Sequence, residues 1–98
     1  MSRSSLQYTP AARVQLRAIG EYTEGKWGKG QRDLYFDKLF AGFDAIRKSP
    51  KKGRLRSDLF EGMLSRRVEK HIAYYFVEKD RILIVGVLHE RMDPTRHL

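Results

Sequence analysis

The chain has 98 residues, which is one domain's worth of sequence, and its longest apolar run is far too short to span a membrane. It contains no cysteine, which excludes disulfides, thiolate metal sites and thiol catalysis. Twenty Lys and Arg residues against 12 Asp and Glu residues give a formal charge of +8, which attracts acidic partners such as nucleic acid or an acidic protein. We therefore expect a protein that binds a macromolecule rather than an enzyme that converts a small metabolite.

The N-terminal part predicts a short edge strand followed by a helix. Residues 6–8 alternate in hydrophobicity, and Thr9 is placed to cap a helix whose first turn holds Pro10. Apolar residues then recur at helical spacing as far as Tyr22 or Thr23. Three glycines break the pattern at positions 25, 28 and 30, and we expect Trp27, which lies among them, to pack back onto the helices as a lid.

A second helix is predicted from residue 31 to residue 48, before Pro50 and Gly53 end it. With the first helix it should form an antiparallel hairpin. Its apolar arc is broad enough to touch both the first helix and a sheet. The arc consists of Leu34, Tyr35, Phe36, Leu39, Phe40 and Phe43. Part of it could remain uncovered as a groove for a partner peptide, or all of it could be ordinary core.

The C-terminal half changes from helical to alternating periodicity and predicts a sheet. Residues 49–62 are irregular, residues 66–70 form a polar strand, and residues 72–77 form a strand of β-branched and aromatic residues. Residues 82–88 are almost wholly apolar, so they should form a central strand that is buried on both faces. The predicted fold is a single α+β domain over residues 1–98, with the element order β-α-α-β-β-β.

A basic segment joins the helices to the sheet, and no aromatic residue interrupts it. Such a segment suits contact with phosphates or carboxylates better than base stacking. A solvated loop is the alternative, because the chain is basic throughout. The segment comprises Arg47, Lys48, Lys51, Lys52, Arg54 and Arg56.

Cationic residues recur on the third predicted strand and next to it, at Arg66, Arg67, Lys70 and His71. Side-chain alternation puts Arg67 on one face of the sheet and Arg66 with Val68 on the other. Cations on a sheet face could clamp a phosphate, a chemistry that would also want a general acid or base. Only His71, His89 and His97 could supply that group at neutral pH, and each could equally be an ordinary surface histidine. No histidine pair has a ligand spacing, so we expect no metal site.

The C-terminal half contains the string Leu88-His89-Glu90-Arg91-Met92-Asp93 with a terminal His97-Leu98. With this string as its most specific part, it resembles the ParE branch of the RelE/ParE toxin superfamily. The N-terminal half agrees through Trp27-Gly28, Ser49-Pro50 and Gly53-Arg54. The similarity extends from Leu6 to Leu98, and the family has the predicted element order.

The resemblance implies a type II toxin–antitoxin system. Its toxins are small, basic, cytoplasmic bacterial proteins that are neutralised by an antitoxin, here a ParD-like protein that represses the operon by binding operator DNA. ParE toxins inhibit DNA gyrase by direct binding and need neither a cofactor nor a membrane, and they serve in plasmid stabilisation. RelE relatives are ribosome-dependent mRNA endoribonucleases. A third possibility is a non-toxic member that acts only in operon repression.

The resemblance also assigns expected roles to residues. For target contact we expect His89, Arg91, Met92, Arg96, His97 and Leu98. For antitoxin contact we expect Leu34, Tyr35, Leu39, Phe40 and Phe43. If the chain were a nuclease, the catalytic set would be Arg67, His71, Arg91 and His97, which only loosely imitates the nuclease branch. At the first helix the chain has Gln15-Leu16, where the family usually has an acidic residue before the Leu.

Overall fold

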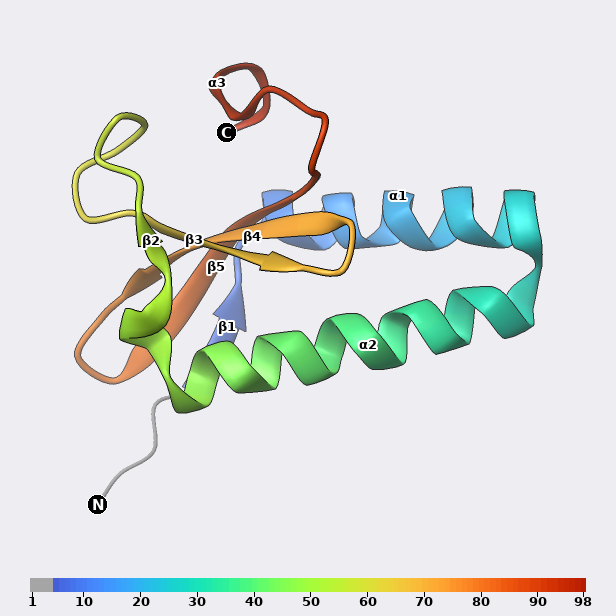
Figure 1. Cartoon of the computed structure of the whole chain (residues 1–98), viewed down its shortest axis with the longest axis horizontal. Helices are drawn as coiled ribbons and strands as arrows, with labels where there is room; N and C mark the ends of the chain where they lie inside the picture. The colour runs from blue at the N-terminus through green and yellow to red at the C-terminus, as the bar shows by residue number, and fades with distance from the viewer. Residues whose placement is uncertain (1–4) are drawn as a thin grey trace.

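The structure, a computed structural model, describes residues 5–98 and consists of a helical hairpin packed on a five-stranded mixed sheet (Figure 1). The α+β class and the predicted hairpin-on-sheet arrangement are therefore confirmed. The sheet order is β1-β5-β4-β3-β2. The elements are β1 Ser5–Tyr8, α1 Pro10–Trp27, α2 Lys29–Lys48, a 3-10 turn Pro50–Lys52, β2 Arg54–Leu55, β3 Leu64–Val68, β4 His71–Val77, β5 Arg81–His89 and α3 Pro94–His97.

Helix α1 begins as the sequence predicts but ends later. The Thr9 hydroxyl accepts a hydrogen bond from the Ala12 amide at 3.1 Å, and Pro10 occupies the first turn. The helix continues through Gly25 and ends at Gly28, whose φ of +90° is a conformation that glycine adopts without steric cost. One residue therefore makes the turn between the helices, and α2 begins at Lys29, two residues before the predicted start.

The predicted central strand is confirmed. Strand β5 pairs in parallel with β1, with Leu6 opposite Ile82, and antiparallel with β4, with Ile72 opposite Leu88. Strand β3 ends at Val68, short of the predicted residue 70, because Glu69 adopts a φ of +57° and turns the chain into β4. The two-residue strand β2, inside the segment predicted to be irregular, adds an edge to the sheet beside β3.

The two faces of the sheet are covered by different parts of the chain. On one face Leu39, Phe43 and Ile46 of α2 are fully buried against the sheet. Helix α2 approaches β3 closely at Gly42, where a Cβ atom would lie 2.3 Å from Val68 Cγ1. The other face has a smaller cluster of Met63, Tyr74 and Leu88, against which Leu59 and Leu98 pack.

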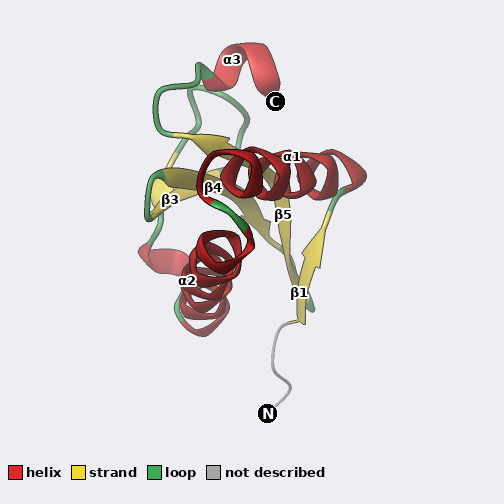
Figure 2. Cartoon of the chain, turned by 90° about the vertical axis from the view of Figure 1, so that its right-hand side faces the viewer, coloured by secondary structure: helices red, strands yellow, loops and turns green. Residues whose placement is uncertain are grey.

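Helix α2 and the C-terminal helix α3 lie in different parts of the molecule. In both views α3 and α2 lie on opposite sides of the sheet region (Figure 1 and Figure 2). The far end of the hairpin projects beyond the sheet on the side where β5 ends (Figure 1). Within residues 5–98, no helix combines the length and the apolar character that crossing a membrane requires.

Candidate functional site

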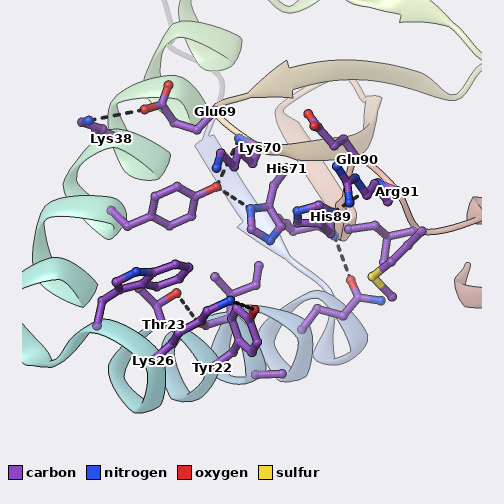
Figure 3. Close-up of a pocket in the computed structure, with 18 of the residues that line it drawn as sticks. Tyr22, Thr23, Lys26, Lys38, Glu69, Lys70, His71, His89, Glu90 and Arg91 are labelled. Carbon is purple, nitrogen blue, oxygen red and sulfur yellow. Dashed lines mark hydrogen bonds and ion pairs between the residues drawn. The ribbon is translucent and has the colours of Figure 1, made fainter.

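A cavity of about 1100 Å³ lies between the projecting part of the hairpin and the end of β5. We call it the hairpin cavity. Aromatic, cationic and histidine side chains from four parts of the chain meet there, as Figure 3 shows. The lining includes Gln15, Tyr22, Lys26 and Trp27 of α1, Tyr35 and Lys38 of α2, Glu69, Lys70 and His71 at the β3–β4 turn, and Val87, His89, Glu90, Arg91, Met92 and His97 from β5 onward.

Tyr35 and His71 form the central contact of the cavity. The Tyr35 hydroxyl accepts a hydrogen bond from the Lys70 amide at 3.2 Å and lies 2.5 Å from Nδ1 of His71 (Figure 3). Burial lowers the pKa of His71 to about 4, and the neighbouring His89 adds to this effect. His71 is therefore neutral at pH 7, and its unprotonated Nδ1 accepts a hydrogen bond from the Tyr35 hydroxyl. Burial also raises the pKa of Tyr35, which keeps it a donor.

His89 extends this arrangement to the end of the sheet. Its ring stands edge-on to that of His71, with 5.4 Å between the ring centroids. Its Nδ1 accepts a hydrogen bond from the Arg91 amide at 3.2 Å, which fixes the turn that leaves β5. The histidine pair thus joins the β3–β4 turn to the C-terminal tail, by which we mean residues 90–98.

Two carboxylates at the edge of the cavity are paired with cations. Glu90 contacts Arg67 at 2.6 Å, and Glu69 lies 3.7 Å from Lys38. Arg67 projects from β3 on the face away from α2, whereas Arg66 donates to the Ala45 carbonyl of α2, so the predicted alternation of these two side chains is correct. Arg67 is not among the residues that line the cavity.

The outer wall of the cavity is aromatic. Tyr22 and Trp27 meet edge-to-face with 6.1 Å between their ring centroids, and the Lys26 ammonium lies over both rings. Trp27 is 56% exposed, so the expectation that it packs back as a closed lid is wrong. As the last residue of α1 it does pack back onto its own helix, at Tyr22, but it does not cover the helix pair.

A network centred on Gln15 holds the C-terminal tail beside the cavity. Its Oε1 accepts a hydrogen bond from the Val87 amide at 2.8 Å, and its Nε2 donates to the His97 carbonyl at 3.4 Å. The Leu98 side chain packs over Gly86, where a Cβ atom would lie 2.3 Å from Leu98 Cδ2. Asp93 caps α3 by accepting from the Thr95 amide at 3.0 Å.

The structure gathers most of the residues expected to contact the target. His89, Arg91, Met92 and His97 all line the cavity. Arg96 is exposed, with its guanidinium 4.0 Å from Asp93, and is not part of the cavity lining. Leu98 faces Gly86 and secures the tail. Of the nuclease set, His71, Arg91 and His97 come together, and Arg67 stays outside.

The residues expected to contact an antitoxin divide into two groups. Leu34 and Phe40 are 56% and 49% exposed, and half-buried Tyr35 lines the cavity. Leu39 and Phe43 are fully buried in the core under α2, so their expected exposure to a partner is wrong. The apolar arc is therefore mostly core, because the sheet covers the stripe that contains these two residues.

Sequence reasoning missed the Tyr35–His71 contact and the role of Gln15. Tyr35 precedes His71 by 36 positions and Gln15 precedes Val87 by 72, so no local spacing links them. The sequence marks Tyr35 only as part of an apolar stripe. Within the described residues 5–98, no three His, Asp or Glu side chains gather as metal ligands.

Fold and site together define a small basic α+β protein with a helical hairpin on a mixed sheet and a cationic, aromatic cavity at the hairpin's projecting end. Residues 6–94 match the family model described as ParE toxin of type II toxin-antitoxin system, parDE. The chain belongs to this ParE toxin family.

Curated relatives and a solved structure agree with that membership. The chain is 31% identical to Toxin ParE1 of Mycobacterium tuberculosis, over 92% of this chain and 93% of the relative. It is 33% identical to Toxin ParE of Escherichia coli, over 92% of this chain and 88% of the relative. A solved structure described as "Chromosomal ParDE TA system from P. aeruginosa" has a TM-score of 0.77 at 18% identity, over 89% of this chain and 96% of that chain, so the fold is shared.

Proposed function

We propose that this ParE-family chain is a toxin that inhibits DNA gyrase by direct binding and is neutralised by a cognate ParD-like antitoxin. Family membership supports the toxin–antitoxin class. The charge of +8 would draw the chain toward a DNA–enzyme complex. The structurally similar chain from P. aeruginosa belongs to a ParDE system, which supports an antitoxin as partner.

The state of His71 is the observation that favours binding over catalysis. An efficient general acid or base has a pKa near the working pH, whereas the His71 pKa is about 4 and its Nδ1 is engaged by Tyr35. Arg67, the strand cation that a nuclease would use to hold phosphate, is 2.6 Å from the Glu90 carboxylate. The Tyr35–His71 and Arg67–Glu90 contacts fix the positions of these side chains, which favours binding over proton transfer.

In this proposal the target contacts lie along the wall formed by the end of β5 and the tail. His89, Arg91, Met92 and His97 present cationic, imidazole and thioether groups there, and Arg96 adds an exposed charge beside them. The antitoxin would cover the exposed apolar residues Leu34 and Phe40. In the repressed state, a toxin–antitoxin hetero-oligomer would bind operator DNA through the antitoxin. A cytoplasmic location and a role in plasmid stabilisation belong to the same proposal.

Supercoiling by purified gyrase tests the proposal. Adding the chain should block supercoiling and cause cleaved DNA to accumulate, and adding the antitoxin should restore supercoiling. Arg91→Ala combined with His97→Ala should raise the concentration needed for inhibition by about tenfold or more, because each substitution removes a contact group. Arg17→Ala, which removes one exposed charge that does not line the cavity, is the control and should have little effect. Full potency of the tail variant would contradict the assigned surface.

The gathering of His71, Arg91 and His97 in one cavity favours a second candidate, a ribosome-dependent mRNA endoribonuclease. Expression in cells separates the two functions. Gyrase inhibition predicts filamentous cells with damaged DNA, whereas the ribonuclease predicts arrested translation with cut mRNA. A member active only in operon repression predicts normal growth when the antitoxin is absent.

A further inference from the structure

The basic segment between α2 and β3 has no part in the hairpin cavity. Between Asp44 and Asp58 the chain carries six cations and no acid. The two flanking carboxylates pair with half of them: Asp44 lies 2.8 Å from Arg47 and 3.1 Å from Lys48, and Asp58 lies 3.0 Å from Arg56. Lys51, Lys52 and Arg54 form no ion pair with any of the described residues 5–98.

We call Lys51, Lys52 and Arg54 the basic turn, and all three are exposed. The backbone that carries them is fixed to the sheet. The Tyr75 hydroxyl donates to the Pro50 carbonyl at 2.7 Å, and Gly53 lies so close to the same ring that a Cβ atom would be 2.1 Å from the Tyr75 hydroxyl oxygen. Arg54 then pairs with Ser65 at the edge of β3. The backbone that carries the three charges is therefore held in place before any partner binds.

The basic turn lies at the opposite end of α2 from the hairpin turn, a helix length of about 30 Å away (Figure 1). None of its residues lines the hairpin cavity. The basic turn and the hairpin cavity are therefore separate surfaces.

We propose that the basic turn is a docking surface for the phosphate backbone of duplex DNA. Duplex DNA presents a negative charge about every 1.7 Å, so three exposed cations close together in sequence, on a backbone held to the sheet, can each meet a phosphate without an enclosed pocket. Lys supplies a point charge and Arg a fork of donors, and both bind phosphate. Contacts of this kind carry no sequence information, so the surface should bind unrelated duplexes equally. This inference does not depend on gyrase being the target.

Fluorescence anisotropy with a labelled duplex tests the proposal on the free full-length chain. The variant Lys51→Gln/Lys52→Gln/Arg54→Gln should weaken binding at low salt by about tenfold or more. The slope of log affinity against log salt should fall by about 2 to 3, because up to three phosphate contacts are lost. Two duplexes of unrelated sequence should give the same result.

A matched control separates a local surface from the overall charge. Arg17→Gln/Lys29→Gln/Lys79→Gln removes the same three units of charge at exposed positions elsewhere. It should keep most of the affinity. Equal losses in the two triple variants would overturn the proposal, because they would assign the attraction to net charge alone. Competition by polyglutamate as strong as that by unlabelled duplex would also overturn it, in favour of an acidic protein partner. Circular dichroism confirms that each variant is folded.

Discussion

The two faces of the sheet are covered in different ways. The close contacts at Gly42 and Gly86 allow the rigidity of the two coverings to be compared. On the helical face, a Cβ atom at Gly42 would lie 2.3 Å from Val68 Cγ1. On the opposite face, a Cβ atom at Gly86 would lie the same 2.3 Å from Leu98 Cδ2. Val68 is a β-branched residue within β3, whereas the Leu98 atom that meets Gly86 is the far end of a flexible side chain outside the sheet. The same clash therefore meets a rigid neighbour on one face and a movable neighbour on the other.

This contrast matches the positions of the two clusters. The helical face carries the larger core, with Leu39, Phe43 and Ile46 fully buried. The opposite face is covered by the segment before β3 and by the tail, which also carries the residues proposed to contact the target. We infer that stability resides mainly in the helical face and that the tail can be altered without unfolding the domain.

The largest effect is expected from Phe43→Ala. Its ring is fully buried and packs edge-on to Tyr8 and Phe40, so truncation should leave a cavity and cost about 3–5 kcal/mol of unfolding free energy. Urea denaturation measures the loss. Phe40→Ala, at a 49% exposed position on the same helix, is the control and should cost much less. Similar costs for the two variants would contradict the division of the apolar arc into core and surface.

Gly42→Ala should destabilise the fold by about 1–2 kcal/mol. Overpacking against Val68 costs about 1–3 kcal/mol, and the better helix propensity of alanine offsets up to about 1 kcal/mol of it. The double variant Gly42→Ala/Val68→Ala should be more stable than the sum of its single variants predicts, because the smaller side chain makes room for the new methyl group. Additive effects in this cycle would show that α2 can move away from β3.

The pH dependence of the unfolding free energy tests the contact between Tyr35 and His71, at the edge of the helical face. The pKa of His71 falls from 6.5 in the unfolded chain to about 4 in the fold. Between these values the unfolded state binds more protons, so the contribution of His71 to stability is constant above pH 6.5 and falls as the pH drops toward 4. The 2.5-unit difference, discounted for partial exposure, corresponds to about 1–2 kcal/mol.

Urea denaturation at pH 7 and pH 5, with and without His71→Gln, measures this contribution. The His71→Gln substitution should remove part of the loss of unfolding free energy between pH 7 and pH 5. NMR titration should show His71 deprotonating near pH 4. A His71 pKa near 6.5 would contradict the buried contact with Tyr35.

Gly86→Ala should change the unfolding free energy least, by about 0.5 kcal/mol or less, because Leu98 can move aside. The tail should nevertheless detach: carboxypeptidase should remove residues from the C-terminus faster than in the unaltered chain. Gln15→Ala, which removes the hydrogen bond to the His97 carbonyl, should act in the same direction. A stability loss equal to that of Gly42→Ala would show that the two faces are equally rigid.

Features that depend on residues close together along the chain were predictable from the sequence. The Thr9 cap with Pro10, the helical stripe of α2 and the apolar run of β5 each follow from local chemistry, and all appear in the structure. The errors fall at the ends of elements and at the two short elements β2 and α3. The glycine pattern predicts that α1 ends near Gly25, but a single glycine in an exposed helix costs only about 1 kcal/mol, so the helix continues to Trp27.

The candidate site was predictable only in part. The string from His89 to Met92 marked one wall, because those residues are adjacent in the sequence and leave the sheet together. The opposite wall could not be found, because Tyr22 and Trp27 carry no polar pattern that distinguishes a cavity wall from a core. Leu39 and Phe40 are neighbours in one apolar arc, yet one is buried and the other is half exposed.

The class of the fold, the excess of positive charge and the family follow from the amino-acid sequence, because periodicity, composition and motif strings are local properties of the chain. Three features arise only from folding: Tyr35 meets His71, Gln15 holds the tail and, within residues 5–98, three cations remain without an ion pair at the basic turn. Each of these depends on residues brought together from distant positions. Their burial and pairing follow from how the hairpin lies on the sheet, which no local pattern encodes.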